Sequence, residues 1–271
     1  MHEAMINVGI KVEEIPGTER LKVSGRGELH LAILIETMRR EGYEMEVSKP
    51  QVILKKMGGK TLEPVEEVII EAEEEYQSVV MQAIGARKAE MRNLKTTSSG
   101  TRRMEFIIAS RALIGFRSEF LMMTRGNGIM YQNFLEYQIY KGDIPGRQSG
   151  VLISHGSGDA VAYALYNLQP RGEIFVKPGD KLYEGMIVGV NNKGNDLVVN
   201  ALRGKKLTNM RAAGSDEAIA LIPPRQMTLE FTLEFIDDDE LVEITPKNIR
   251  LRKFNLTEVG RRRVTRSAKS K

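Results

Sequence analysis

Residues 65–91 read VEEVIIEAEEEYQSVVMQAIGARKAEM, and this stretch decides the fold class. Its first part, residues 65–72, is rich in β-branched residues and is predicted to be a strand. Residues 77–91 are predicted to be a helix, because apolar residues recur along one side of it. That side is formed by Val80, Ala83, Ile84 and Met91. A strand followed at once by such a helix predicts an α/β sandwich.

The same alternation continues to residue 140. We expect a strand over residues 104–109, a short helix over 116–124 and a further strand over 130–140, with glycine and serine in the turns. This order is typical of a ferredoxin-like βαββαβ unit, and we assign it to residues 59–142.

The chain upstream of this unit shows a similar but shorter pattern. Residues 4–9 resemble the end of a helix, and residues 11–15 and 20–23 are predicted to form a hairpin that turns at Pro16-Gly17. A helix over 28–41 and a strand over 43–56 follow. The helix places Leu31, Leu34, Ile35 and Met38 on one face. Residues 1–58 are therefore predicted to be a ferredoxin-like unit that lacks its first strand, and the chain is expected to be a fragment.

Residues 143–271 are predicted to form a third, β-rich domain. Strands are expected over 150–154, 174–176, 181–190, 197–200 and 218–222, and a helix over 159–168. Residues 227–236 are ambiguous, because their apolar residues alternate as in a strand while Thr228 could cap a helix. Periodicity alone favours the strand. The predicted fold class is α+β, with two ferredoxin-like sandwiches followed by this domain.

Composition excludes several classes of protein. The absence of cysteine excludes disulfides and thiolate zinc sites, and no apolar run is long enough to span a membrane. The net charge is only +4, but it is segregated along the chain. Residues 247–271 are basic, with Glu258 as their one acid, whereas residues 62–75 and 237–243 are acidic. Segregated charge predicts a polyanionic partner, although a solvated tail is an equal alternative for the last residues.

Three segments resemble nucleotide-binding motifs, and each lacks an essential part. Gly59-Lys60-Thr61 follows Leu54 where a phosphate-binding loop needs glycine, and Pro64 prevents the required helix. Asp143-Ile144-Pro145-Gly146 resembles a switch motif, and Asn192-Lys193-Gly194-Asn195 lacks the carboxylate that reads guanine. The glycine-rich turn around His155 is a weak candidate for anion contact. We therefore expect no catalytic residue, cofactor or metal site in this chain.

A basic loop over residues 201–214 is the main candidate for binding. Its positive side chains suit phosphates, and its asparagine suits a ribose or base edge. The candidate residues are Arg203, Lys205, Lys206, Asn209 and Arg211, to which we add Lys193 in a preceding turn. Composition alone leaves an ordinary exposed loop as an equal alternative.

A second basic set lies in the unit at residues 59–142. Its members are Arg87, Lys88 and Arg92 at the predicted helix end, Arg102 and Arg103 before the next strand, and Arg117. The dipole of a helix favours cations at its C-terminus, so this effect alone can account for about half of these basic residues. No aromatic pair of the type found in RNA-recognition sheets lies on a central strand. We therefore expect RNA contact from loops and helix ends, without base stacking on the sheet.

Four motifs together resemble the BipA (TypA) family of translational GTPases. They are VSGRGELHL at residues 23–31, SRALIGFRSEF at 110–120, GKKLTNMR at 204–211 and FIDDDELVE at 235–243. The first is shared with the third domain of elongation factor G, and the resemblance covers essentially the whole chain. It implies an elongation factor G domain III-like unit, a domain V-like unit and a family-specific C-terminal domain, and it favours a helix at 227–236.

The resemblance also implies a function. The family joins a GTPase domain and a β-barrel to these three domains, so GTP and magnesium would be bound by an N-terminal domain that this chain lacks. The implied role is cytoplasmic ribosome binding in large-subunit assembly and stress-dependent translation, by a monomer that does not bind membranes. Ribosomal RNA is the implied partner, and tRNA and ribosomal proteins remain open as others.

Two alternative functions remain at this point. The first is a protein-interaction scaffold, in which the acidic segment 62–75 contacts a basic ribosomal protein. The second is an independent nucleotide hydrolase that uses the turn at 154–160, although the sequence offers no nucleophile–base pair for it.

Overall fold

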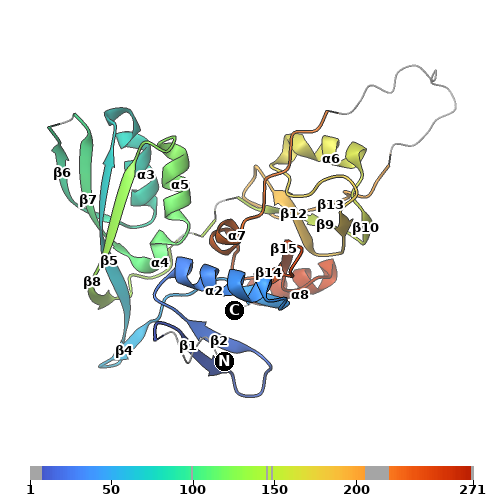
Figure 1. Cartoon of the computed structure of the whole chain (residues 1–271), viewed down its shortest axis with the longest axis horizontal. Coiled ribbons are helices and arrows are strands. Elements are labelled where there is room, and N and C mark those ends of the chain that lie inside the picture. Colours follow the sequence, from blue (N-terminus) through green and yellow to red (C-terminus); the bar gives the residue numbers. More distant parts are fainter. Residues whose placement is uncertain (1–7, 99, 145, 148, 205–219, 270–271) are drawn as a thin grey trace. The chain divides into compact units, whose positions relative to one another are not determined.

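The computed structural model describes residues 8–98, 100–144, 146–147, 149–204 and 220–269, which have a mixed α+β fold (Figure 1). The chain forms two compact units: unit 1 comprises residues 1–49 and 147–271, and unit 2 comprises residues 50–146. This division differs from the predicted boundaries 1–58, 59–142 and 143–271, because most of the first predicted domain shares a unit with the last. No helix in the described part of the chain is long and apolar enough to cross a membrane.

Unit 2 has the complete β-α-β-β-α-β order of a ferredoxin-like unit. Its sheet is antiparallel, with the strand order β8-β5-β7-β6, and the short β4 pairs with the beginning of β5. The strands are β4 (Lys55–Met57), β5 (Lys60–Ala72), β6 (Glu90–Thr96), β7 (Arg102–Ala109) and β8 (Ile129–Ile139). The helical segments are η1 (Glu74–Tyr76), α3 (Gln77–Ala86), α4 (Ser110–Leu113) and α5 (Phe116–Met123).

The core of unit 2 lies between this sheet and its helices. Val68 and Ile70 of β5 are fully buried, as are Ile84 of α3 and Phe116 of α5. Alternate residues of a strand point to the same face, so the buried residues of β5 mark the face that the helices cover. This packing confirms the predicted core role of Val80, Ala83 and Ile84, whereas Met91, predicted on the same side, lies on β6 and is 48% exposed.

The helix predicted over residues 77–91 is too long. It ends at Ala86, and β6 occupies Glu90–Thr96, where no strand had been predicted. The reason is a tight turn in which Lys88 adopts a φ of 61°, outside the helical region. Arg92 therefore lies on a strand and not at a helix end.

Unit 1 is built on a six-stranded sheet with the order β13-β9-β12-β15-β14-β3. β13 and β9 are parallel, and the other neighbours are antiparallel. The strands are β3 (Met45–Ser48), β9 (Val151–Ser154), β12 (Met186–Val190), β13 (Leu197–Val199), β14 (Glu240–Ile244) and β15 (Ile249–Lys253). A separate pair is formed by β10 (Gly158–Asp159) and β11 (Lys181–Leu182), and α6 (Ala162–Leu168) leads into η2 (Gln169–Arg171).

The single strand predicted over residues 43–56 is two strands in different sheets. β3 pairs with β14, with Val47 opposite Val242, whereas β4 belongs to unit 2. Pro50 lies between them and has no N–H to donate to a ladder. β14 supplies the backbone partners that β3 lacks within its own segment, and this accounts for the grouping of residues 1–49 with the C-terminal part.

Residues 227–236 are helical, as the family resemblance favoured, so the strand suggested by periodicity is wrong. The helix α7 (Leu229–Phe235) begins after Thr228, whose side-chain oxygen accepts a hydrogen bond from the N–H of Phe231. Leu229 and Leu233 point into the core from one side of α7. The alternation predicted a strand because Leu229 and Leu233 are four residues apart, a spacing that fits one face of a helix as well as one face of a strand.

The remaining part of unit 1 differs from the prediction in detail. The strand expected over 181–190 is interrupted at Gly185, where φ is +85° and a Cβ would lie 2.6 Å from the backbone of Leu256. Only Ile174 of the expected strand 174–176 forms a bridge. Residues 220–222 are not in a strand, and 218–219 lie outside the described residues. No prediction had been made for β14, β15 or α8 (Glu258–Lys269).

The N-terminal segment contributes a hairpin and a helix to unit 1. β1 (Lys11–Glu14) and β2 (Leu21–Ser24) form the predicted hairpin, while residues 4–7 of the expected preceding helix lie outside the described residues. α2 (Glu28–Arg40) packs on α7 and buries Ala32 and Ile35 in the same core. Leu31, Leu34 and Met38 of its predicted apolar face are half-buried.

The ion pairs near the C-terminal end of α2 lead to a testable prediction for the pKa of Glu36. Glu36 accepts hydrogen bonds from Arg39 and Arg40, and together these arginines lower the pKa of Glu36 to about 2. Because the folded-state pKa is depressed, the stabilisation is present above the ordinary pKa near 4.5 and is lost as pH falls toward about 2. NMR titration of the Glu36 carboxyl should give this low value, and Arg39→Ala should raise it. An unchanged pKa in that variant would contradict the assignment.

Candidate nucleic-acid interface

The basic loop of residues 201–214 begins on the core of unit 1. Val199 and the loop's first residue, Ala201, are buried, and Leu221, the next described core residue along the chain, packs against the same cluster. The carbonyl of Ala201 accepts a hydrogen bond of 3.0 Å from the N–H of Val161. Binding residues are commonly carried by loops that start from a rigid core.

The glycine-rich turn at residues 154–158 supports the first end of this loop. The N–H of His155 donates to the carbonyl of Val199 at 3.0 Å, and a Cβ on Gly158 would lie 3.4 Å from the side chain of Leu202. The turn leads into β10, and α6 starts only at Ala162. Its amides therefore do not belong to a helix N-terminus, and the weak anion-site candidate gains no support from the fold.

Of the predicted loop residues, the structure describes only the first. Arg203 is exposed at the described end of the loop. Lys193 is exposed in the turn between β12 and β13, where its backbone carbonyl accepts a hydrogen bond from the N–H of Gly150. Lys205, Lys206, Asn209 and Arg211 lie outside the described residues.

Two members of the second basic set stabilise unit 2. Arg87 donates to the carbonyl oxygen of Ala112 at 2.7 Å and forms an ion pair with Glu119 at 2.6 Å. The Nζ atom of Lys88 donates to the carbonyl oxygen of Asp143 at 2.7 Å. These contacts join the end of α3 to α4, α5 and the segment after β8. Both side chains are thus already engaged within the unit.

The other arginines of this set fall into two groups. Arg102 pairs with Glu74, and Arg103 pairs with Glu71 at 2.8 Å and with Glu105 at 3.2 Å. Hydrogen bonds from Arg103, with a smaller contribution from Asn93, lower the pKa of Glu105. By contrast, Arg92 on β6 is exposed, and its nitrogen lies 3.9 Å from Glu90. Arg117 is exposed on α5.

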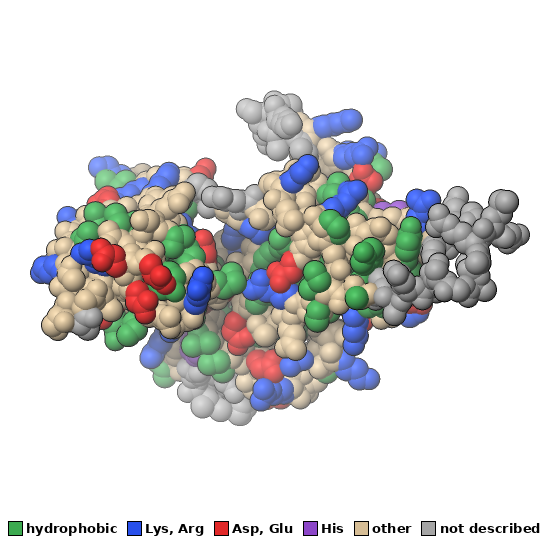
Figure 2. Space-filling view, turned by 90° about the horizontal axis from the view of Figure 1, so that it is seen from above, with side chains coloured by type: hydrophobic (Ala, Val, Ile, Leu, Met, Phe, Trp, Pro, Cys, Tyr) green, Lys and Arg blue, Asp and Glu red, His purple; other side chains and the backbone are tan. Residues whose placement is uncertain are grey.

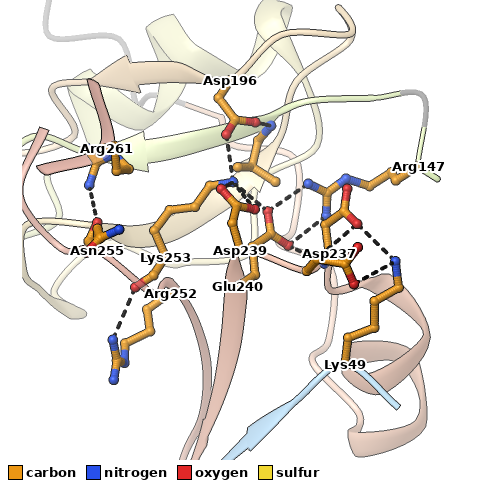
Figure 3. Close-up of polar contacts among 12 residues, drawn as sticks. Lys49, Arg147, Asp196, Asp237, Asp239, Glu240, Arg252, Lys253, Asn255 and Arg261 are labelled. Atoms are coloured by element: carbon orange, nitrogen blue, oxygen red, sulfur yellow. Dashed lines mark hydrogen bonds and ion pairs between the residues drawn. The ribbon is translucent and has the colours of Figure 1, made fainter. Parts of the chain in front are cut away.

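A buried ion network in unit 1 was not recognised from the sequence (Figure 3). Glu240 is fully buried and receives two hydrogen bonds from Arg147, at 2.8 and 3.0 Å. Its carboxylate also lies 3.0 Å from Lys253, and it accepts the N–H of Asp237 at 2.9 Å. A carboxylate in this position is stable only because cations and amides satisfy it on all sides.

Further carboxylates complete the network around Lys253. Its ammonium group contacts Asp196 at 2.7 Å and Asp239 at 3.0 Å, although only 3% of its side chain is exposed. Burial lowers the pKa of Lys253, but the charge of Glu240 and the hydrogen bonds to Asp196 and Asp239 outweigh burial and raise it. Lys49 binds Asp237 at 2.9 Å and overcomes the effect of burial, so that the pKa of Asp237 is lowered.

The network accounts for the acidic run at residues 237–243, which the sequence shows only as segregated charge. Its partners Lys49 and Arg147 are distant in sequence, and Lys253 lies 14 residues after Asp239. The pairing therefore leaves no local signal. Among the described residues, no group of three or more His, Cys, Asp or Glu side chains could hold a metal ion. The acidic motif thus stabilises unit 1 by binding Lys49, Arg147 and Lys253.

Comparisons with known proteins match most of the chain. A family profile described as "Elongation factor G C-terminus" matches residues 60–148, and one described as "TypA/BipA C-terminal domain" matches residues 149–258. The chain is 53% identical over 268 residues to "Large ribosomal subunit assembly factor BipA" of Escherichia coli strain K12, covering 98% of the chain. The Haemophilus influenzae protein of the same name is 51% identical over 269 residues. The chain spans 44% of the length of each of these relatives.

The buried network predicts a large cost for removing Glu240. Glu240→Gln should lower the free energy of unfolding by about 3–5 kcal/mol, because Arg147 and Lys253 would be left buried without their shared anion. The matched control is Glu258→Gln, which breaks the exposed pair with Arg262 and should cost under about 1 kcal/mol. Urea unfolding of both variants measures the difference, and equal costs would refute the proposed role of Glu240.

Proposed function

The chain belongs to the TypA/BipA family and corresponds to the C-terminal region of its members, and we propose from this that it binds ribosomes during assembly of the large subunit. The observation that carries the proposal is the 53% identity, over 98% of the chain, to a protein named as a large ribosomal subunit assembly factor. Such a factor must recognise a surface made largely of RNA.

The loop over residues 201–214 is the proposed contact with ribosomal RNA. In this proposal Arg203, Lys205, Lys206 and Arg211 bind phosphates, and Asn209 binds a ribose or base edge. The anchoring of the loop's first residue, Ala201, on the core supports this role, because it fixes where the loop leaves unit 1. Lys193 is a further proposed phosphate contact, and a tRNA bound to the same ribosome is a second proposed partner.

We also propose RNA contacts from the second basic set, and its exposed members differ from those already engaged within unit 2. Arg92 and Arg117 are exposed on unit 2 and suit phosphate binding. Any RNA contact by Arg87, Lys88, Arg102 or Arg103 would compete with the hydrogen bonds and ion pairs that hold unit 2 together. Within this set, Arg92 and Arg117 are therefore the first choice as RNA phosphate contacts.

The parent protein's chemistry is part of the same proposal. We propose that GTP hydrolysis, with bound magnesium, belongs to an N-terminal domain of the parent protein and that this chain acts as its docking region. Residues 1–58 would correspond to the elongation factor G domain III-like unit, which the order β1, β2, α2 and β3 supports. A cytoplasmic location and a monomeric state are part of the same proposal.

Ribosome binding should depend steeply on salt if the loop neutralises phosphates. We expect co-sedimentation with large ribosomal subunits to weaken as salt rises, with a logarithmic slope of about 0.7–0.9 per phosphate contact. Lys205→Glu combined with Lys206→Glu should weaken binding and reduce the slope by about 1.5, since two contacts are removed. Lys11→Glu with Lys22→Glu, on the β1–β2 hairpin, is the charge-matched control and should change binding less.

Two results would contradict this proposal. Binding that ignores salt would exclude phosphate contacts as its basis. Crosslinks from the acidic segment 62–75 to ribosomal proteins, with none from the chain to RNA, would instead support the scaffold alternative.

A further inference from the structure

At its lower end, the sheet of unit 2 extends beyond the helices that cover the rest of it. In Figure 1, β4 and the adjoining ends of β5 and β8 extend away from α3 and α5. Leu62 of β5 lies opposite Lys55 of β4 on one side and opposite Ile139 of β8 on the other. Directly opposed residues of antiparallel strands share a face, so these three side chains lie on one surface.

Two aromatic residues of β8 lie on the same surface. Tyr137 is opposite Pro64, and a bulge between Val65 and Glu66 shifts the register so that Phe134 lies opposite Glu66. The rings of Phe134 and Tyr137 are in contact, with their centroids 5.6 Å apart. Phe134 is 61% exposed, although aromatic side chains are usually covered in folded proteins.

Lysines border this aromatic pair. The Nζ atom of Lys55 lies 3.9 Å from the centroid of Tyr137, a cation–π contact. Met57 pairs with Lys60 across a turn in which Gly58 and Gly59 both have positive φ, so Lys60 shares the face of Lys55. Lys56 points to the opposite face. Within the described part of the chain, none of the three lysines forms an ion pair with a carboxylate.

We propose that this face, defined by Lys55, Lys60, Phe134 and Tyr137, binds single-stranded RNA. The exposed ring of Phe134 would stack on an unpaired base, and the two ammonium groups would bind the flanking phosphates. Glu66, opposite Phe134, disfavours a phosphate at that end, which fixes the order of base and phosphate along the face. The proposal is independent of the loop in unit 1 and adds a contact of another kind to the proposed function.

The aromatic pair also revises an expectation from the sequence. Stacking on the sheet had been disfavoured because no aromatic pair lies on a central strand. In the described residues, β8 pairs only with β5 and is an edge strand of the sheet. The stacking surface therefore arises at an edge, where a bulge brings Phe134 and Tyr137 to one side.

Stacking is tested with the full 271-residue chain and a fluorescein-labelled ten-nucleotide oligouridine. Phe134→Leu should weaken binding by about tenfold in an anisotropy titration, because a stacking ring is lost while an apolar side chain is kept. The matched control is Tyr131→Leu, on the same strand but paired with Ile69 on the opposite face and 55% exposed. This control should bind like the unmodified chain.

The phosphate contacts are tested on the same probe. Lys55→Gln combined with Lys60→Gln should reduce the logarithmic salt slope by about 1.4, or about 0.7 for each single-strand phosphate contact. Lys56→Gln, on the opposite face, should leave both affinity and slope unchanged. A duplex of the same length should bind more weakly than the single strand, because its bases are already stacked.

Several outcomes would overturn the inference. It fails if Phe134→Leu and Tyr131→Leu have equal effects, or if an acidic peptide such as oligoglutamate binds this face as tightly as the oligouridine. If the Lys205 and Lys206 variant loses ribosome binding while oligouridine binding ignores Phe134, the proposed function stands and this inference is refuted. If oligouridine binding requires Phe134 but ribosome binding ignores the loop, this inference stands and the loop proposal is refuted.

Discussion

The buried carboxylate of Glu240 is the constraint on which the arrangement of unit 1 depends. It connects the segment at Arg147, the acidic turn before β14 and the end of β15, which come from separate parts of the chain. A charge in this position is tolerated only when its partners are in place, so the network specifies one arrangement of these segments. The same principle operates in unit 2, where buried Glu63 pairs with Arg111 at 2.5 Å and accepts the N–H of Lys141.

The same reasoning divides the basic residues into two groups. Some stabilise the fold through internal ion pairs, and others are not ion-paired and can bind a partner. Arginines with a planar, multiply donating head form most of the internal contacts, as Arg87, Arg103 and Arg147 show. Among the described residues, the lysines at the β4–β5 hairpin and the positive residues near the basic loop form no ion pair, although Lys55 makes a cation–π contact with Tyr137. Lys and Arg side chains lie on the surface of both units (Figure 2). The net charge therefore says less about function than the geometry of the individual side chains does.

Sequence reasoning predicted the α+β class and most elements of unit 2, because β5 and α3 carry strong periodic signals. It failed where a tertiary contact decided the structure. The end of α3 depends on the turn at Lys88, and the division of the 43–56 strand depends on a partner strand near residue 242. The candidate residues of the basic loop were selected by composition and resemblance, whereas the stacking face depends on a bulge and strand pairings that have no local signature.

The pairing of β3 with β14 has a consequence for how the chain folds. Val47 finds its partner only at Val242, and all of unit 2 lies between the two strands. During synthesis from the N-terminus, unit 2 is complete well before β14 has been made, so it can fold first as an autonomous insert. β3 has no partner strand until β14, near the end of the 271-residue chain, emerges. The order of assembly is thus set by topology, with the middle of the sequence forming before the unit that encloses it in the chain.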